Sequence, residues 1–281
     1  MSRERVKNRT DALVEEVLNL TKQLDDEDSI KRCAIPWAAP VPCFGSLNSR
    51  VATLGLNPSN LEYVDRKEHP LSARDIRLET LSSLGLESWR EADEGHAKRI
   101  LGSCESYFLR NPYNQWFRPL DRLLAPARAS YYTQIGATAC HLDLVPYATW
   151  KKWSSLRAQE RSDLIKIGAR SLARVLQLSD VQILVLNGRS VIQEVERSLA
   201  QDPSWISSST SMPEWSLQNG RVAGAAYVAK TSRISNVDLG RTVLLLGYNH
   251  NIQSSFGVTS EVTRKISEWI KEFGDNWNDQ S

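Results

Sequence analysis

The sequence predicts an α/β protein with a three-layer αβα arrangement around a four-stranded, mainly parallel sheet. Two observations predict this fold. Four short apolar runs lie along the chain, and segments with helical periodicity occur between them. Strands that alternate with helices favour a parallel sheet with right-handed crossover connections. The four runs are Val51–Leu56, Ala137–Val145, Val181–Leu186 and Thr242–Leu246.

The first element is an amphipathic helix over residues 11–24, where apolar side chains recur at helical spacing. It belongs to an N-terminal helical extension over residues 1–30. The proline-rich stretch "IPWAAPVPCFGS" follows and favours extended or irregular backbone. The last two apolar runs, "VQILVL" and "TVLLLG", are continuously apolar, as expected for strands that are covered on both faces.

Further helical patterns cover residues 154–178 and 190–200, and a closing helix begins near Ser260, a favourable N-cap residue. Residues 201–240 are the least regular part of the chain. They are Ser-rich and then alternate in "RVAGAAYVAKTSR", which indicates an inserted hairpin. Because no repeat or low-complexity tract divides the chain, we expect residues 1–281 to form a single domain.

The composition sets limits on the partners of this protein. The chain has 281 residues and a net charge of +2, from 35 Lys and Arg against 33 Asp and Glu. Any contact with nucleic acid therefore needs a local basic patch and not overall charge. No apolar run approaches the roughly 20 residues that span a bilayer, and the charged N-terminus lacks the apolar region of a secretory signal. We expect a soluble, cytoplasmic protein with no membrane partner and no obligate protein partner.

Several kinds of site can be dismissed from the sequence. The G-x-S-x-G, G-x-G-x-x-G and P-loop motifs are absent, and the four histidines are scattered. The cysteines lie at wide, irregular intervals without a C-x-x-C pair, so no zinc site is expected. An iron–sulfur cluster on four thiolates is the alternative to four free buried thiols. We expect no metal and no cofactor. The cysteines are Cys33, Cys43, Cys104 and Cys140.

Each apolar run delivers a polar side chain at or near its carboxyl end: Asn57, Asp143, Asn187 and His250. In open parallel sheets the ligand crevice lies outside the carboxyl ends of the strands. Each residue alone has a structural explanation, since asparagine before proline or glycine is a common turn former. Their coincidence predicts that the four side chains converge on one pocket.

Five segments resemble the motifs of the uracil-DNA glycosylase superfamily, in family order. "GLNPS" (55–59) is similar to the G-I-N-P-G or G-M-N-P-G strand exit of the mismatch-specific and single-strand-selective branches. "NQWFR" (114–118) resembles N-H-F-W-K, "DLVP" (143–146) resembles N-L-C-P, and "VLNGRSVIQEV" (185–195) resembles V-F-N-G-K. "GYNHNIQSS" (247–255) stands at the H-P-S-P motif and keeps its histidine but not its prolines.

The resemblance implies a uracil-DNA glycosylase-like fold and a monofunctional DNA glycosylase that leaves an abasic site. Such an enzyme rotates its nucleotide out of the helix into a pocket. Asn57 would hold a water against the sugar carbon through its amide oxygen, acting by positioning because an amide is a poor base. His250, in its neutral form, would donate to the base oxygen as negative charge develops there. No lysine adjoins the four polar positions, so Schiff-base chemistry is not expected.

The resemblance also suggests which residues bind DNA. Backbone amides near the first and last motifs would hold phosphates, and either Ile252 or Phe256 would fill the gap left in the duplex. Aromatic residues would stack on the flipped base, although a place in the core explains them equally well. The expected phosphate and DNA contacts are Pro58, Ser59, Asn60, Arg189, Asn251, Ile252, Ser254 and Ser255. The expected base contacts are Tyr63, Tyr113, Trp116, Phe117 and Asn187, together with Asp143.

Asp143 is the most informative departure from the family pattern. Uracil-specific relatives carry asparagine there, which can both donate and accept, whereas an ionised carboxylate only accepts. Cytosine presents an N4 amino donor, for which a carboxylate is the natural partner. Because removal of ordinary cytosine would destroy the host genome, we expect a modified cytosine, such as glucosylated hydroxymethylcytosine in phage DNA, and a role in anti-phage defence. The alternative is that Asp143 pairs with an arginine.

Three other functions remain open at this point. The protein could remove uracil or mismatched thymine in DNA repair, could be a catalytically inactive nucleic-acid-binding module, or could hydrolyse small nucleosides. An oligonucleotide panel separates the first from removal of modified cytosine. An Asn57→Ala variant that keeps its biological effect would favour the second. Preference for free nucleosides over DNA would indicate the third.

Overall fold

The computed structural model describes residues 3–132, 138–199, 206–253 and 257–278. The helices are α1 (Arg3–Asp26), α2 (Asp28–Lys31), α3 (Leu81–Leu84), α4 (Glu94–Glu105), α5 (Asn114–Leu124), α6 (Ala158–Gln177), α7 (Arg189–Leu199) and α8 (Ser260–Asn278). The strands are β1 (Val51–Gly55), β2 (Ala139–Asp143), β3 (Ile183–Asn187), β4 (Ile206–Ser211), β5 (Ala225–Ile234) and β6 (Val237–Tyr248). All four predicted strands and the four predicted helices are present.

The chain divides into two compact units that are interleaved in sequence. Unit 1 comprises Met1–Gly45, Leu56–Pro112 and Leu142–Leu178, and unit 2 comprises Ser46–Gly55, Tyr113–His141 and Ser179–Ser281. No change in composition marks the points where the chain passes from one unit to the other, and the sequence predicted a single domain.

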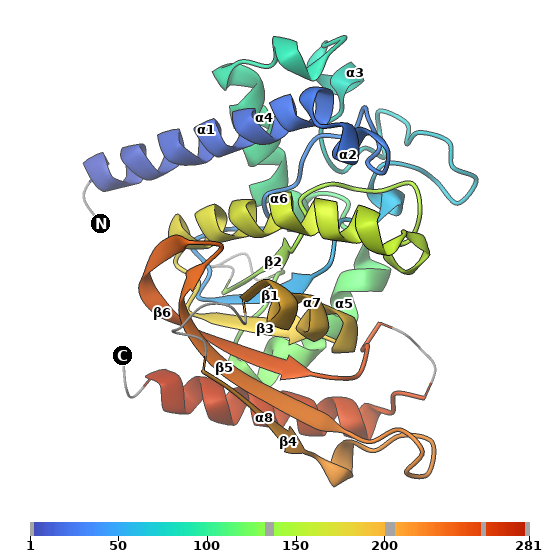
Figure 1. Cartoon of the computed structure of the whole chain (residues 1–281), viewed down its shortest axis with the longest axis vertical. Helices are drawn as coiled ribbons and strands as arrows, with labels where there is room; N and C mark the ends of the chain where they lie inside the picture. Colours follow the sequence, from blue (N-terminus) through green and yellow to red (C-terminus); the bar gives the residue numbers. More distant parts are fainter. Residues whose placement is uncertain (1–2, 133–137, 200–205, 254–256, 279–281) are drawn as a thin grey trace. The chain divides into compact units, whose positions relative to one another are not determined.

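The strands form one six-stranded sheet in the order β2-β1-β3-β6-β5-β4 (Figure 1). Strand β3 is parallel to both β1 and β6, whereas β5 is antiparallel to β6 and β4 is antiparallel to β5. The α/β class is therefore confirmed, but the sheet has six strands and not the four that were predicted. The reason is that the irregular 201–240 segment supplies β4 and β5, which extend the sheet beyond β6.

The register aligns the ends of the parallel strands of unit 2. Leu54 of β1 pairs with Leu186 of β3, and Asn187 of β3 pairs with Tyr248 of β6. The carboxyl ends of β1, β3 and β6 therefore lie at the same edge of the sheet. Asn187 is the last residue of β3, and His250 follows β6 by two residues.

Helices cover both faces of β3 and β6 in unit 2. A side chain at Gly247 of β6 would lie 3.0 Å from Ile192 of α7, and Gly247 pairs with Leu186 of β3. On α8, a side chain at Gly274 would lie 3.6 Å from Ile183 of β3. Because successive strand residues face opposite sides, Ile183 and Leu186 lie on different faces. Helices α7 and α8 therefore pack against opposite faces of the sheet.

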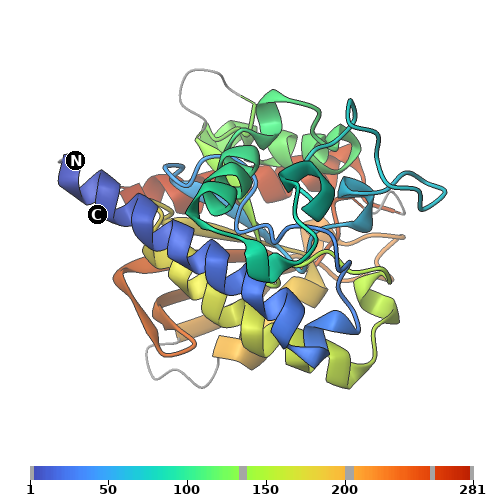
Figure 2. The same cartoon turned by 90° about the horizontal axis from the view of Figure 1, so that it is seen from above.

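Three helices of unit 1, α2, α4 and α6, contact α1. Helices α1 and α6 run side by side in both views (Figures 1 and 2), and α4 also contacts α1. Helix α6 approaches the backbone after β2 closely, since a Cβ at Gly168 would lie 2.2 Å from the carbonyl oxygen of Leu144. Only glycine permits this approach.

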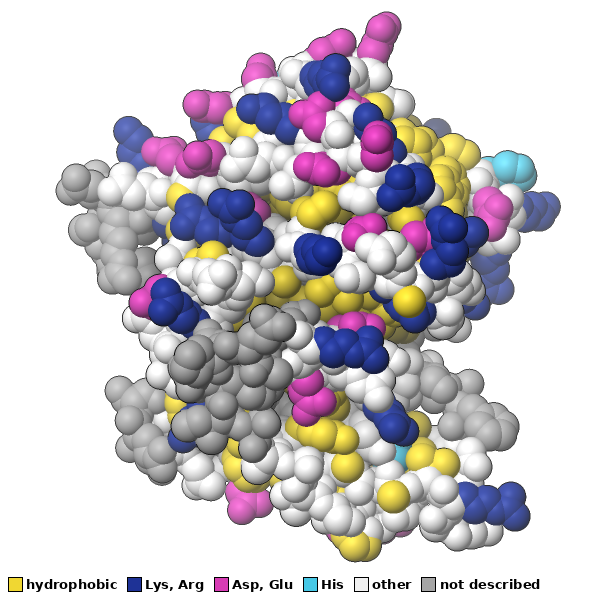
Figure 3. Space-filling model, in the orientation of Figure 1, with side chains coloured by type: hydrophobic (Ala, Val, Ile, Leu, Met, Phe, Trp, Pro, Cys, Tyr) yellow, Lys and Arg dark blue, Asp and Glu magenta, His cyan; other side chains and the backbone are white. Residues whose placement is uncertain are grey.

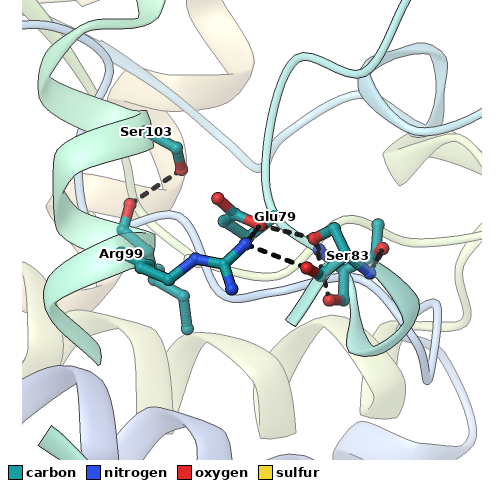
Figure 4. Close-up of polar contacts among 6 residues, drawn as sticks. Glu79, Ser83, Arg99 and Ser103 are labelled. Atoms are coloured by element: carbon teal, nitrogen blue, oxygen red, sulfur yellow. Dashed lines mark hydrogen bonds and ion pairs between the residues drawn. The ribbon is translucent and has the colours of Figure 1, made fainter. Parts of the chain in front are cut away.

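A polar network joins α3 to α4 in unit 1 (Figure 4). The Arg99 guanidinium of α4 donates to Glu79 Oε2 at 3.3 Å and to the Ser83 carbonyl at 2.9 Å. Ser83 Oγ in turn donates to Glu79, and Thr80 caps α3 by accepting from the Ser83 amide. Ser103 donates to the Ile100 carbonyl within α4. These contacts explain how a four-residue helix is held in place.

The closing helix begins where the sequence predicted, but its cap is different. Helix α8 starts at Ser260, and Thr259 Oγ1 accepts from the Val262 amide at 3.2 Å. The N-cap is therefore Thr259 and not Ser260, because the capping side chain must precede the first helical residue.

On the face drawn in Figure 3, the Lys and Arg side chains of the described residues are interspersed with those of Asp and Glu. All four cysteines are buried and unpaired by disulfides. Among the described residues, no cluster of three or more His, Cys, Asp or Glu side chains could hold a metal ion. Nor does the described part of the chain contain a helix with the length and apolarity to cross a bilayer.

Candidate active site

The Asn57 side chain is held in one orientation in unit 1. Its Nδ2 group donates to Thr149 Oγ1 at 3.0 Å, to the Pro58 carbonyl at 3.0 Å and to the Tyr147 carbonyl at 3.4 Å. Carbonyl oxygens only accept, so the amide nitrogen must face them. The other end of the amide, Oδ1, has no hydrogen-bond partner among the described residues. The half-buried Asn57 therefore presents a fixed acceptor.

Two chain segments build the support for Asn57. The Val145 amide donates to the Leu56 carbonyl at 2.9 Å, which joins the chain after β1 to the chain after β2. Residues 146–149 are held in turn by the proline-rich stretch, through hydrogen bonds from the Val41 amide to Pro146 and from the Ile35 amide to Ala148. The stretch "IPWAAPVPCFGS", for which the sequence predicted extended or irregular backbone, thus supports the segment that orients Asn57 through these hydrogen bonds.

Asp143, at the end of β2, lies near a second buried carboxyl group, Glu62. Glu62 accepts from the Tyr107 hydroxyl at 2.7 Å, and the Arg77 Nε atom lies 4.0 Å away. The pKa of Glu62 is raised to about 7, mainly by burial and in addition by the negative charge of Asp143, while Tyr107 and Arg77 oppose the shift. The two carboxyl groups favour a state in which Glu62 keeps its proton.

In unit 2, both ends of the Asn187 side-chain amide are hydrogen-bonded within the protein. Its Nδ2 atom donates to Gln253 Oε1 at 2.8 Å, and its Oδ1 atom accepts from the Tyr248 hydroxyl at 2.8 Å. The side chain thus joins the ends of β3 and β6 to the segment that follows β6. An amide has two N–H donors and two acceptor lone pairs, so one N–H and one lone pair remain beyond these two bonds.

His250 is buried in unit 2, and its Nε2 atom lies 2.7 Å from the Trp215 carbonyl. Because a carbonyl only accepts, Nε2 must carry the proton. Burial lowers the pKa of His250 below its ordinary value, while the Trp215 bond opposes this shift. The neutral ring expected from the sequence is therefore favoured, but its one N–H is engaged with Trp215. The predicted donation to a base requires that N–H to leave the carbonyl.

The predicted stacking residues differ in exposure. Tyr63 is buried, and its hydroxyl donates to the Ala39 carbonyl at 2.6 Å. Phe117 is buried against Tyr131 and His141. Both rings thus occupy the core, which is the alternative that the sequence left open. Tyr113 and Trp116 are half-buried in unit 2.

The predicted DNA contacts are also spread over the two units. Pro58 is buried, Asn60 is half-buried, and Ser59 caps the short 3-10 helix η1 (Asn60–Glu62) by accepting from the Leu61 amide. In unit 2, Arg189 and Asn251 are exposed, whereas Ile252 is buried. Ser254, Ser255 and Phe256 lie outside the described residues.

Sequence reasoning missed the residues that orient the site. Thr149 lies 92 positions from the asparagine that it holds, and Glu62 ends the 3-10 helix η1 without a sequence motif of its own. The only sequence signal for these residues was the position of Thr149 shortly after the "DLVP" segment.

The chain matches no known family model, and no curated protein matches it. The fold and the site therefore define the class of protein only as an α/β protein with a mixed parallel and antiparallel sheet.

Proposed function

We propose that this protein is a monofunctional DNA glycosylase that hydrolyses the N-glycosidic bond of a flipped, modified pyrimidine. The observation that carries the proposal is the orientation of Asn57. Three acceptors fix the nitrogen end of its amide, and the oxygen end is left as an acceptor at the exit of β1. This is what a water-positioning amide needs, because a fixed acceptor can hold one water in line with a sugar carbon.

The reaction needs little activation of that water. As the C1′–N1 bond breaks, its electron pair passes to the departing base and positive charge develops on the sugar. The oxygen of the water held by Asn57 then bonds to C1′, and its proton passes to solvent. His250 would stabilise the charge on the base once its Nε2–H turns from the Trp215 carbonyl toward the base oxygen.

Asp143 supports a base of the cytosine type. An ionised carboxylate accepts from the N4 amino group, and the buried acid Glu62 beside it favours a single negative charge in this pair. Because ordinary cytosine must be spared, the base would be a modified one, such as glucosylated hydroxymethylcytosine in phage DNA. The biological role would then be anti-phage defence.

The test is to incubate the purified protein with DNA that carries uracil, a T·G mismatch, plain cytosine or glucosylated hydroxymethylcytosine, and to assay for abasic sites. We expect abasic sites only in the modified DNA. Release of uracil or of mismatched thymine would instead identify a repair enzyme. DNA binding without release of any base would identify an inactive binding module, and preferential cleavage of free nucleosides would identify a nucleoside hydrolase.

A pair of asparagine variants makes the test specific to the site. Asn57→Ala removes the fixed acceptor, and we expect the rate of base release to fall by about 100-fold. Asn48→Ala is the matched control, since Asn48 is exposed and its side chain makes no hydrogen bond with a described residue. An Asn57→Ala protein as active as the Asn48→Ala protein would overturn the proposal.

A further inference from the structure

An aromatic and basic surface follows directly on the segment that holds Asn57. We call it the tryptophan–lysine surface and define it as Trp150, Lys151 and Lys152 in unit 1. Trp150 is 42% exposed, which is rare for a large apolar side chain among the described residues. Both lysines are exposed, and neither ammonium group is in an ion pair with a described residue.

A backbone hydrogen bond and an aromatic contact hold Trp150 in place. The Trp150 amide donates to the Cys33 carbonyl at 3.2 Å, and the indole packs edge-on against Trp37, with ring centroids 6.2 Å apart. Trp37 packs in the same way against the buried Tyr63, at 6.0 Å. The Trp150 ring is therefore held by other rings on one side and is open to solvent on another. A pre-oriented ring loses little entropy when it stacks on a ligand.

The surface is also continuous with the candidate site. Thr149 Oγ1 accepts from Asn57 Nδ2 at 3.0 Å and donates to the Lys151 carbonyl at 2.7 Å. One hydroxyl thus ties the backbone of the surface to the side chain that would hold the water. A strand bound here would lie next to the nucleotide that Asn57 acts on.

Positive charge gathers around this surface. Burial raises the pKa of the Cys33 thiol, and the negative charge of Glu160 adds to that shift, whereas the charges of Arg32, Arg157 and Lys151 oppose it. Three cations and one anion therefore lie near Cys33. Arg157 is in an ion pair with Glu160 at 2.7 Å, and the charge of Lys151 also acts on Glu160, but neither Lys151 nor Lys152 forms an ion pair with a described residue. In a chain with a net charge of only +2, such a cluster is the local basic patch that nucleic-acid binding requires.

We propose that Trp150, Lys151 and Lys152 bind an unpaired segment of a DNA strand, with a base stacked on the indole and phosphates against the two ammonium groups. Aromatic rings beside unpaired cations are the features by which proteins hold single strands. A protein partner is less suited, because one exposed ring does not make an extended apolar patch. This inference rests on the proposed function for the position of the bound strand next to the nucleotide at Asn57. Binding of the strand to this surface does not itself require base removal.

The experiment measures binding of a fluorescein-labelled 15-nucleotide oligothymidine by fluorescence anisotropy over a range of salt concentrations. We expect Trp150→Ala to weaken binding by about 10-fold, because one stacked base is lost. The double variant Lys151→Glu/Lys152→Glu should flatten the slope of log affinity against log salt by at least about 1.4, since each phosphate contact to a single strand contributes about 0.7.

Matched controls lie on the same unit. Leu109→Ala removes an apolar side chain that is 69% exposed, and Lys22→Glu/Lys166→Glu reverses two exposed lysines on α1 and α6. Both control proteins should bind more tightly than the corresponding surface variants. Equal affinities in either comparison, with all proteins folded by circular dichroism, would overturn the inference. Absence of oligonucleotide binding in the parent protein would also overturn it.

Measurements of binding and of base release on the same purified proteins distinguish failure of this inference from failure of the proposed function. If Asn57→Ala keeps full binding that depends on Trp150, but the parent releases no base from any DNA, the surface stands and the glycosylase proposal fails. If the parent releases a base and the surface variants bind and react as the parent does, the glycosylase proposal stands and the surface fails.

Discussion

At the scale of single residues, the site depends on how an amide is oriented. An asparagine has a donor end and an acceptor end, and only the acceptor end suits the proposed role of Asn57. The sequence predicted the residue from its place at a strand exit. It could not predict the orientation, because the acceptors on Tyr147 and Thr149 reach it only through the fold.

Thr149 is therefore expected to act as a positioning residue. Thr149→Val removes the hydroxyl that accepts from Asn57, so the amide should lose its fixed orientation and single-turnover base release should slow by about 10-fold. Thr149→Ser keeps the hydroxyl and should restore the rate. If the valine variant reacts at the rate of the parent, the hydrogen bond does not orient Asn57.

The buried Glu62 carboxyl predicts a dependence of stability on pH. Its folded-state pKa, about 7, lies above its ordinary value of 4.5, so the folded state holds a proton that the unfolded state has lost. The free energy of unfolding should therefore fall as pH rises from about 4.5 to about 7, by on the order of 3 kcal/mol from this group, and level off above that range.

Glu62→Gln tests this expectation, because glutamine still accepts from the Tyr107 hydroxyl but cannot ionise. Urea unfolding at pH 5 and pH 8 should show a smaller pH dependence in the variant than in the parent. His250 acts with the opposite sign: its lowered pKa costs stability only as pH falls below its ordinary value of 6.5. A variant with an unchanged slope between pH 5 and pH 8 would show that Glu62 is ionised in the folded state.

At the scale of elements, the four apolar runs identified β1, β2, β3 and the end of β6. The runs of β3 and β6 are continuously apolar because strands that are covered on both faces have no polar alternation. The sequence did not identify β4 and the full length of β6. These strands depend on pairing between distant segments, as in Ser209 with Tyr227 and Val228 with Leu246. The alternation in "RVAGAAYVAKTSR" was the available signal, and it predicted a hairpin without placing it at the edge of the sheet.

The approach of α6 to the chain after β2 predicts the effect of a small substitution. Gly168→Ala would place a Cβ 2.2 Å from the Leu144 carbonyl oxygen, so the helix must shift. We expect a loss of about 2 kcal/mol in the free energy of unfolding. Gly102→Ala, in α4, meets nothing within 4 Å and should stabilise the protein by about 0.5–1 kcal/mol through helix propensity alone. Similar effects of the two substitutions in urea unfolding would contradict the close approach.

At the scale of the whole molecule, the chain passes repeatedly between its two units. Strand β1 belongs to unit 2, but the residues directly after it belong to unit 1, and β2 begins in one unit and ends in the other. Local sequence patterns report which residues form a strand and which face is apolar. They do not report which distant segments share a core, so the interleaving of the two units could not be predicted from the sequence.

Interleaving predicts that neither unit can be obtained from one continuous piece of the chain. Residues 179–281 hold most of unit 2 but lack β1, which pairs with β3, and α5, which packs against α8. Without β1, the backbone groups along that side of β3 lose their partners, and burying them unpaired costs free energy. We expect the 179–281 fragment to show no cooperative thermal unfolding by circular dichroism, and co-expression with residues 1–178 to restore it. A sharp transition in the isolated fragment would show that β3 is stable without β1, and that the interleaved topology is not what holds unit 2 together.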